Sequence, residues 1–329
     1  MTLLQNDALL RHAGIEVPLI CGAMYPCSNP ELVAAVSEAG AIGIVQPLSL
    51  TYVHGHDFRE GLRYIRCLTR KPIGVNLIVE QSSRKYLARV QRWLEISLEE
   101  QVPFLVTALG NPRWVVERAA PEGVTVYHDV TERKWAEKAL DGGVDGFICV
   151  NSAAGGHAGR RSAQQLLDEI GPLGMPLVCA GGIGNATQFA AALAMGYAGA
   201  QLGTRFIASD ECSAHNDYKQ AVVRAQAPDI VLTEKLSGVP VSIIKTPYIE
   251  RTGTHAGPLA RWLLRQPRTK HFMRTLYSLQ SIWKLKRAAG QGLNYRNIFQ
   301  AGKSVSGIES VRPVADIVAE FAAAQRQES

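Results

Sequence analysis

The sequence predicts an α/β fold, a TIM-type (β/α)8 barrel followed by a smaller, mainly helical C-terminal appendage. The first 225 residues alternate short apolar runs with amphipathic segments, and eight such units fit into about 200 residues. The apolar runs are continuous, as in parallel strands that are covered on both faces. Glycine-rich loops follow the sixth, seventh and eighth runs. This placement argues against a doubly wound sheet, which usually carries its glycine fingerprint after the first strand.

The elements alternate in order along the first 225 residues. Strands are expected at 18–24, 41–46, 72–79, 103–109, 124–130, 146–150, 176–182 and 199–206. Helices are expected at 30–38, 57–68, 84–99, 112–118, 131–141, 162–170, 187–195 and 214–225. Proline or glycine opens several of the strands, and Asn, Asp, Thr or Ser precedes several of the helices as an N-cap.

The strand–helix alternation ends near residue 226, so we expect three parts. Residues 1–225 form the barrel, 226–305 form a mainly helical lid or insert domain, and 306–329 form a C-terminal helix that packs back on the barrel. Within the insert, the segments 229–240, 258–265 and 269–289 have helical or mixed patterns.

The chain of 329 residues has a net charge of +6, but its basic residues are unevenly distributed. Residues 251–303 contain eleven Lys or Arg and no Asp or Glu, which leaves 24 basic and 29 acidic residues elsewhere. This segment is either a solvated or oligomer-facing surface, or a contact for an anionic group such as a phosphate-bearing cofactor or an acidic partner. No nucleic acid is expected as a partner, because no recognised binding motif accompanies the charge.

The segment patterns predict a cytoplasmic protein. No apolar run reaches the roughly 18 residues that span a bilayer, so no membrane association is expected, and the N-terminus lacks the pattern of a secretory signal. The six cysteines are scattered without a C-x-x-C pair, so we expect reduced thiols and no metal site. A homodimer is compatible with the sequence.

The most informative motif is the loop Ala154-Gly155-Gly156-His157-Ala158-Gly159, which follows the apolar run at 146–150. In a (β/α)8 barrel the active site lies at the carboxyl ends of the strands, where this loop begins. Glycine lets the backbone approach a ligand closely, and the imidazole titrates near neutral pH. We therefore predict that His157 is catalytic, against the alternative that it only lines the loop.

Two more glycine clusters end successive strands, Ala180-Gly181-Gly182 and Gln201-Leu202-Gly203-Thr204. Their backbone N–H groups are suited to hold a phosphate, although tight turns alone would also explain the glycines. Asn76 also ends a strand, and its amide is suited to contact the edge of a planar heterocycle. His128 lies at a further strand end, where a structural histidine is the commoner outcome.

At these residues the chain resembles the FMN-dependent nitronate monooxygenases, formerly called 2-nitropropane dioxygenases. That family is similar to FMN-dependent enoyl-acyl-carrier-protein reductases and to NADH:quinone reductases. The resemblance covers most of the chain and includes the stretches 18–24, 29–43, 72–76, 154–159, 176–184, 199–206, 239–242, 246–248 and 301–304. Ala153 differs from the glutamate of many relatives, and Ala158 is smaller than their residue, which suggests a different substrate.

The resemblance implies FMN as the cofactor, with its phosphate on the loops at Gly181-Gly182 and Gly203-Thr204. It places the Met24 backbone and Asn76 near the flavin ring and makes His157 the active-site acid or base. The full set of cofactor contacts that we expect is Ala23, Met24, Asn76, His128, Gly156, Ala180, Gly181, Gly182, Gln201, Gly203 and Thr204.

Three functions compete. The first is a nitronate monooxygenase that oxidises alkyl nitronates with O2, with His157 as acid or base. The second is an NAD(P)H-dependent reductase of a quinone or enoyl thioester, which the basic segment 251–303 favours because these ligands are anionic or have anionic carriers. The third is a flavin-binding module without turnover. A non-flavin aldolase is poorly supported, because no lysine ends an expected strand.

Overall fold

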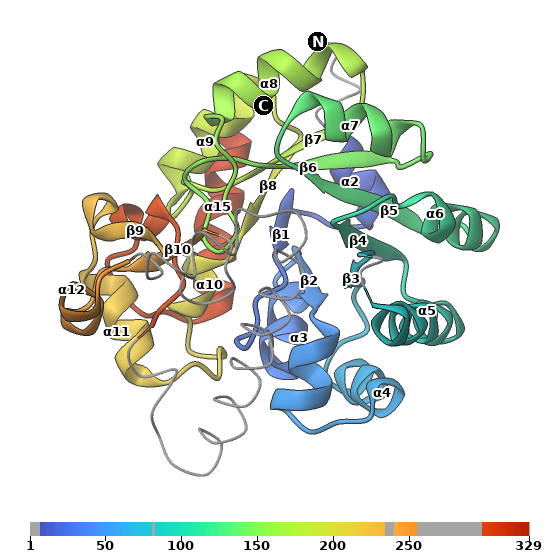
Figure 1. Cartoon of the computed structure of the whole chain (residues 1–329), viewed down its shortest axis with the longest axis horizontal. Coiled ribbons are helices and arrows are strands. Elements are labelled where there is room, and N and C mark those ends of the chain that lie inside the picture. The colour runs from blue at the N-terminus through green and yellow to red at the C-terminus, as the bar shows by residue number, and fades with distance from the viewer. Residues whose placement is uncertain (1–6, 81–82, 234–239, 255–297, 329) are drawn as a thin grey trace, which may run out of the picture.

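The computed structural model describes residues 7–80, 83–233, 240–254 and 298–328 (Figure 1). Its centre is a closed barrel in which eight strands pair in chain order and β8 pairs with β1, all in parallel. The strands are β1 (Leu19–Cys21), β2 (Ile42–Val45), β3 (Ile73–Ile78), β4 (Phe104–Ala108), β5 (Thr125–Val130), β6 (Gly146–Val150), β7 (Leu177–Ala180) and β8 (Gly199–Leu202). The predicted (β/α)8 barrel is therefore confirmed.

Helices surround the strands (Figure 1). They are α3 (Pro30–Glu38), α4 (Phe58–Leu68), α5 (Arg84–Glu99), α6 (Arg113–Ala119), α7 (Arg133–Leu140), α8 (Ala163–Ile170), α9 (Ala186–Met195), α10 (Thr204–Ile207) and α11 (Asn216–Arg224). Short helical turns lie at η1 (Ser49–Val53), η2 (Ala120–Glu122) and η3 (Gly171–Leu173). Side-chain caps begin several helices as expected, for example Asp57 at α4 and Asn185 at α9.

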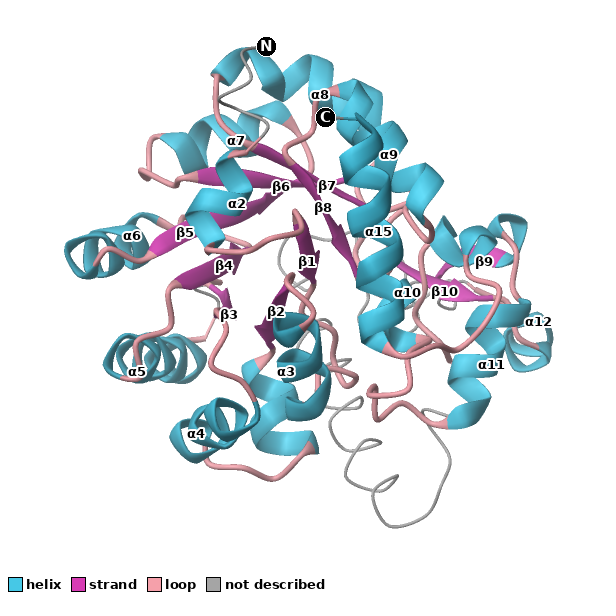
Figure 2. Ribbon diagram, turned by 180° about the vertical axis from the view of Figure 1, so that it is seen from behind, coloured by secondary structure: helices cyan, strands magenta, loops and turns pink. Residues whose placement is uncertain are grey.

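The strands separate two apolar clusters because successive side chains point to opposite faces. The inner cluster fills the barrel and includes Ile20, Phe104, Tyr127 and Val178, while the outer cluster lies between strands and helices. Helix α2 (Ala8–Ala13) adds Leu9 to the inner cluster, and His12 Nδ1 lies 3.1 Å from the Tyr127 hydroxyl. This helix crosses the strands in the rear view (Figure 2) and covers the end of the barrel where the strands begin.

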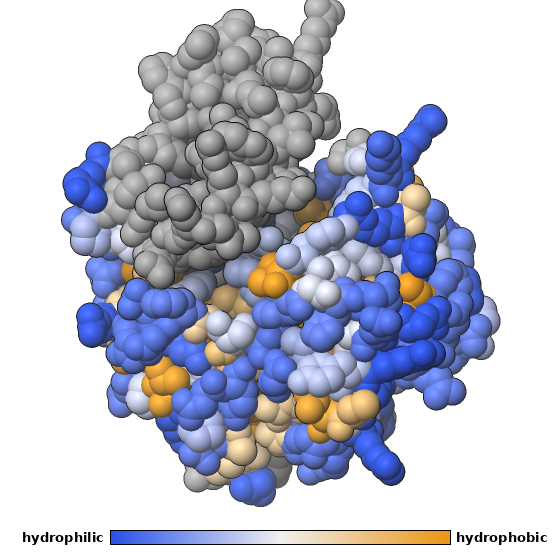
Figure 3. Space-filling view, turned by 90° about the horizontal axis from the view of Figure 1, so that it is seen from below, coloured by the Kyte–Doolittle hydropathy of each residue, from blue (hydrophilic) through white to orange (hydrophobic). Residues whose placement is uncertain are grey.

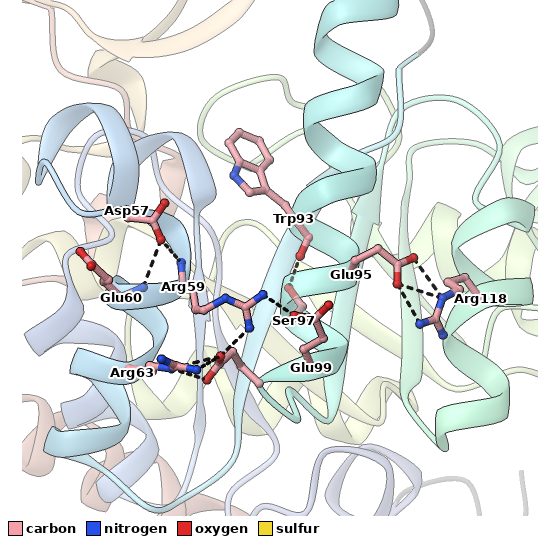
Figure 4. A network of polar contacts seen from close by, with 10 residues as sticks. Asp57, Arg59, Glu60, Arg63, Trp93, Glu95, Ser97, Glu99 and Arg118 are labelled. Carbon is pink, nitrogen blue, oxygen red and sulfur yellow. Dashed lines mark hydrogen bonds and ion pairs between the residues drawn. The ribbon is translucent and has the colours of Figure 1, made fainter.

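Ion pairs link neighbouring helices on the outside of the barrel (Figure 4). Arg59 of α4 pairs with Glu99 of α5, and Arg63 Nη2 lies 2.9 Å from Glu100 Oε1. Arg118 Nη2 of α6 lies 2.8 Å from Glu95 Oε2 of α5. Except for Glu100, which is largely buried, these charges are partly or fully exposed to solvent, so the exposed pairs orient the helices but contribute little to stability.

The eighth strand is shorter than the prediction of 199–206. It ends at Leu202, Gly203 turns the chain, and Thr204–Ile207 form the short helix α10. The apolar residues at 206–207 misled the strand prediction, because both are buried against helices rather than in the sheet.

The described part of 226–305 differs from the mainly helical segment that we expected. After η4 (Ala227–Asp229), strands β9 (Ile230–Thr233) and β10 (Val241–Ile244) form an antiparallel pair, and α12 (Pro247–Thr252) follows. The β-branched residues in both runs favour strands, which the helical interpretation overlooked. The predicted helical segments at 258–265 and 269–289 lie outside the described residues, as does most of the basic segment 251–303.

The chain returns to the barrel through η5 (Lys303–Gly307) and α15 (Val314–Glu328). Helix α15 packs on α9, where the rings of Phe189 and Phe321 lie 5.4 Å apart. The appended elements β9, β10 and α12 gather with the barrel helix α11 on one side of the barrel (Figure 2).

The described surface shows no large apolar face in the view of Figure 3, where small apolar groups lie among hydrophilic residues. Within the described ranges, no helix combines the length and hydropathy needed to cross a membrane. The same ranges hold no group of three or more His, Cys, Asp or Glu that could bind a metal ion.

Candidate active site

The mouth of the barrel at the carboxyl ends of the strands brings most of the predicted residues together. Ala180 belongs to the inner cluster, and Ala23 packs against it. Gln201 also faces inward, because a Cβ added at Gly22 would lie 2.9 Å from its Cγ. Asn76 is buried within β3, two residues before the strand ends, and its Nδ2 donates to the Val106 carbonyl at 3.2 Å. The prediction that Asn76 ends its strand is therefore wrong, because Leu77 and Ile78 continue the pairing with β4. Polar side chains from several strands therefore line one opening.

The loop after β7 has the backbone that its glycines predict. Gly181 and Gly182 have φ of +115° and +83°, a region that other residues rarely adopt. The Asn151 side chain donates from Nδ2 to the Gly181 carbonyl at 2.9 Å, and its Oδ1 accepts from the Ala153 N–H at 2.8 Å. Asn151, which we did not single out from the sequence, thus joins the loop after β7 to the histidine loop after β6.

The loop after β8 contacts the loop after β1. A Cβ added at Gly203 would lie 3.3 Å from Met24 Sδ. The Met24 N–H donates to Ser28 Oγ at 2.8 Å, so this amide, which we expected near a flavin ring, already has a partner within the chain. Thr204 Oγ1 accepts from the Gly302 N–H at 3.0 Å. The phosphate role predicted for Gly203 and Thr204 stays a prediction.

The histidine loop is braced by backbone from the C-terminal part of the chain. The Ser242 N–H of β10 donates to the Gly156 carbonyl at 2.8 Å, and the Lys303 N–H donates to the Ala153 carbonyl at 2.8 Å. A Cβ added at Gly302 would lie 2.6 Å from that same carbonyl oxygen. These hydrogen bonds join backbone atoms only. They therefore hold the histidine loop in place although residue 153 is alanine and offers no carboxylate.

His157 is exposed at the mouth on this braced loop. Protein packed around its ring still lowers the pKa of the imidazole below its ordinary value, because burial disfavours the charged form. The imidazole is therefore neutral at neutral pH, which is the form that can accept a proton. Its catalytic role stays a prediction.

His128 occupies the other face of β5. Its neighbours two residues away, Val126 and Val130, belong to the outer cluster, and its Nδ1 lies 2.8 Å from Thr107 Oγ1. Burial lowers the pKa of His128 to about 4, so the ring is neutral. This placement favours a structural role over the cofactor contact that we predicted from its strand-end position. The sequence-based prediction overlooked the alternation of the strand, which points residue 129 rather than 128 into the barrel.

We expect His128 to make stability pH-dependent. An unfolded histidine has a pKa of about 6.5, so the unfolded chain binds a proton below that pH while native His128 does not. Its contribution is complete above pH 6.5 and is lost as pH falls to about 4, by about 3 kcal/mol in all. In urea unfolding, the stability difference between the natural chain and His128→Asn should shrink by that amount between pH 7 and pH 4. A difference that does not change with pH would contradict this.

The mouth has unpaired polar atoms and close-set glycines that are compatible with a bound ligand. A Cβ added at Gly182 would lie 3.2 Å from the Ala153 Cβ, and one added at Gly203 would lie 3.3 Å from Met24 Sδ, so a side chain at either position would be crowded by the neighbouring loop. Two acceptor atoms of inward-facing residues, Gln201 Oε1 and Asp129 Oδ1, are buried without a hydrogen-bond partner in the described structure. Buried polar atoms normally have partners, so both are free to bind a ligand.

Comparisons with known proteins agree with this geometry. The family model described as nitronate monooxygenase matches residues 6–323. A 5-hydroxy-7a-methyl-1-oxo-octahydro-1H-indene-4-carboxyl-CoA dehydrogenase from Rhodococcus jostii (strain RHA1) is 27% identical over 259 residues, covering 78% of this chain and 71% of that protein. A nitronate monooxygenase from Paraburkholderia phytofirmans is 27% identical over 274 residues, covering 70% of this chain and 74% of that protein.

Solved structures agree as well. FabK from Thermotoga maritima superposes with a TM-score of 0.78 at 27% identity, over 97% of this chain and 96% of that one. A nitroalkane oxidase from Streptomyces ansochromogenes gives a TM-score of 0.77 at 24% identity, over 98% and 100%, a likeness of fold. Because the family model spans nearly the whole sequence, the chain belongs to the nitronate monooxygenase family.

Proposed function

We propose that this protein is an FMN-dependent oxidoreductase that oxidises alkyl nitronates with O2. The observation that carries the proposal is the convergence of three glycine-containing loops, after β6, β7 and β8, on one barrel mouth that also holds His157. Such loops at neighbouring strand ends are typical of phosphate sites in barrels.

In this proposal the backbone of Gly181-Gly182 and Gly203-Thr204 holds the FMN phosphate. Ala23, Met24, Asn76, Gly156, Ala180 and Gln201 surround the ring. When bound, FMN supplies the electron transfer that side chains cannot. His157, neutral and exposed, stabilises the charge of the anionic nitronate or exchanges a proton with the reacting group, and acid–base help of this kind is worth roughly 10²–10⁴-fold in rate.

A second candidate is an NAD(P)H-dependent reductase of a quinone or of a thioester. Two relatives, from Rhodococcus jostii and Mycobacterium tuberculosis, carry the name of a carboxyl-CoA dehydrogenase. Coenzyme A is anionic, and residues 251–303 hold eleven Lys or Arg without an acid.

We propose residues 226–305 as a lid, since Ser242 and Gly302 support the mouth loops.

We expect the protein to purify yellow with one FMN per chain. Under anaerobic conditions a nitronate should bleach the flavin absorbance, and admission of O2 should restore it. Bleaching by NADH or NADPH but not by the nitronate would favour the reductase. A colourless protein that takes up no added FMN would contradict both candidates.

A further inference from the structure

Asp129 ends β5 on the face that looks into the barrel. Val126 and Val130 lie in the outer cluster and Tyr127 in the inner one, so strand alternation points Asp129 inward, one layer closer to the mouth than Tyr127. Its partner in the β6 register is Ile148, which also belongs to the inner cluster. The carboxyl group therefore lies inside the mouth, among the residues proposed to hold FMN.

Asp129 has two neighbours in the barrel that belong to the inner apolar cluster, Tyr127 on β5 and its own register partner Ile148 on β6. Asp129 Oδ1 is buried and has no hydrogen-bond partner among the residues that the structure describes. Leaving a buried acceptor unpaired destabilises a protein by about 1–3 kcal/mol, and a buried charge without a partner destabilises it more. An unpaired carboxyl oxygen at this place is therefore explained most simply by a ligand that forms a hydrogen bond with it.

Within the described ranges, the charged and titratable groups on the elements around β5 do not neutralise Asp129. β4 offers Thr107 and Ala108 at this height. β6 offers Cys149, whose thiol stays neutral because burial raises its pKa. His128 faces the other side of β5 and is neutral, and the Arg and Lys side chains of α7 are exposed outside the barrel. His157 enters from the loop after β6, and its pKa is lowered.

With no cation beside it among the residues that the structure describes, Asp129 retains its proton more readily than an ordinary aspartate. Burial raises the pKa of the carboxyl to about 7. A protonated carboxyl is a hydrogen-bond donor, whereas an ionised one only accepts. A flavin ring has several nitrogen and oxygen acceptors at its edge, and Gln201 Oε1, also without a partner in the described structure, can accept from the ring N–H.

We propose that Asp129, in its protonated form, donates a hydrogen bond to the edge of the FMN ring, so that cofactor binding selects the protonated carboxyl. The inference rests on the proposed FMN site. It makes Asp129 a cofactor-contacting residue that binds one proton together with the flavin.

The test measures the dissociation constant of FMN for the apoprotein between pH 5.5 and pH 9, in the natural chain and in Asp129→Asn, by quenching of flavin fluorescence. Asn donates a hydrogen bond at every pH. Above the pKa of the free carboxyl, the affinity of the natural chain should fall about tenfold per pH unit relative to Asp129→Asn. The FMN phosphate titrates equally in both experiments, so it cancels in the ratio.

Asp168→Asn, an exposed carboxylate on α8, is the matched control and should follow the natural chain. Calorimetry in two buffers should show uptake of a proton on FMN binding at pH 8 by the natural chain. This second measurement needs no variant, so it decides the matter even if Asp129→Asn fails to fold. A ratio of affinities that does not change with pH, a ratio that changes in the opposite direction, or no proton uptake would overturn the proposal. Absence of FMN binding at every pH would instead overturn the proposed function.

Discussion

His157→Asn should lower turnover by roughly 10²–10⁴-fold while FMN binding and the melting temperature stay near those of the natural chain. Asn has a similar polarity but cannot exchange a proton near neutral pH. The loop that carries His157 is held by backbone hydrogen bonds from Ser242 and Lys303, which the substitution leaves intact. The side chain is exposed, so its loss opens no cavity in the core. Steady-state turnover, flavin content and thermal unfolding of one preparation measure the three quantities.

His12→Asn is the matched control, because that imidazole lies at the closed end of the barrel, beside Tyr127. Its turnover should stay within a few-fold of the natural chain. If His157→Asn also stays within a few-fold, the imidazole only lines the mouth. If it loses FMN or fails to fold, the residue is structural, and the reaction loses the group on which its acid–base chemistry depends.

The barrel could be predicted from the sequence because its strands carry a local signal. Runs such as 72–79 and 146–150 are apolar throughout, since each strand is covered by the inner cluster on one face and by helices on the other. Because nearly every residue of such a run is apolar, the sequence does not show which side chains point into the barrel and which point toward the helices. In β5 both faces are buried, so the sequence pattern alone could not tell that Asp129 rather than His128 points into the barrel.

The candidate site was predictable only where it consists of strand ends. Gly181, Gly203 and His157 follow apolar runs, and the barrel rule brings them to one mouth. The brace from Ser242 and Gly302 depends on residues far away in the chain, and no local pattern reports such contacts. The β9–β10 pair was missed for a related reason, because short apolar runs suit either a helix or a strand until their pairing is known.

Gly181→Ala should weaken FMN binding by roughly 10–100-fold, since losing one hydrogen bond from the loop to a charged phosphate would remove about 1.5–3 kcal/mol of binding free energy. At φ +115° an added Cβ would lie 2.5 Å from the Ala154 backbone nitrogen and 2.6 Å from Asn151 Oδ1. Neither atom is the end of a flexible side chain that could simply swing away, because Asn151 Oδ1 is held by the Ala153 N–H. The loops after β6 and β7 must therefore separate, which displaces both the proposed phosphate cradle and the histidine loop.

Gly123→Ala is the matched control, because it has the backbone strain of a positive φ but not the crowding that an added Cβ meets at Gly181. Gly123 has φ +71°, and an added Cβ there has no atom within 4 Å. Both substitutions place alanine in a sparsely populated region, which destabilises by roughly 1–3 kcal/mol, so both should lower the melting temperature. Only Gly181→Ala should raise the dissociation constant of FMN, because Gly123 precedes β5 at the closed end of the barrel. Equal FMN affinities in the two variants would show that the loop after β7 does not form the cofactor site.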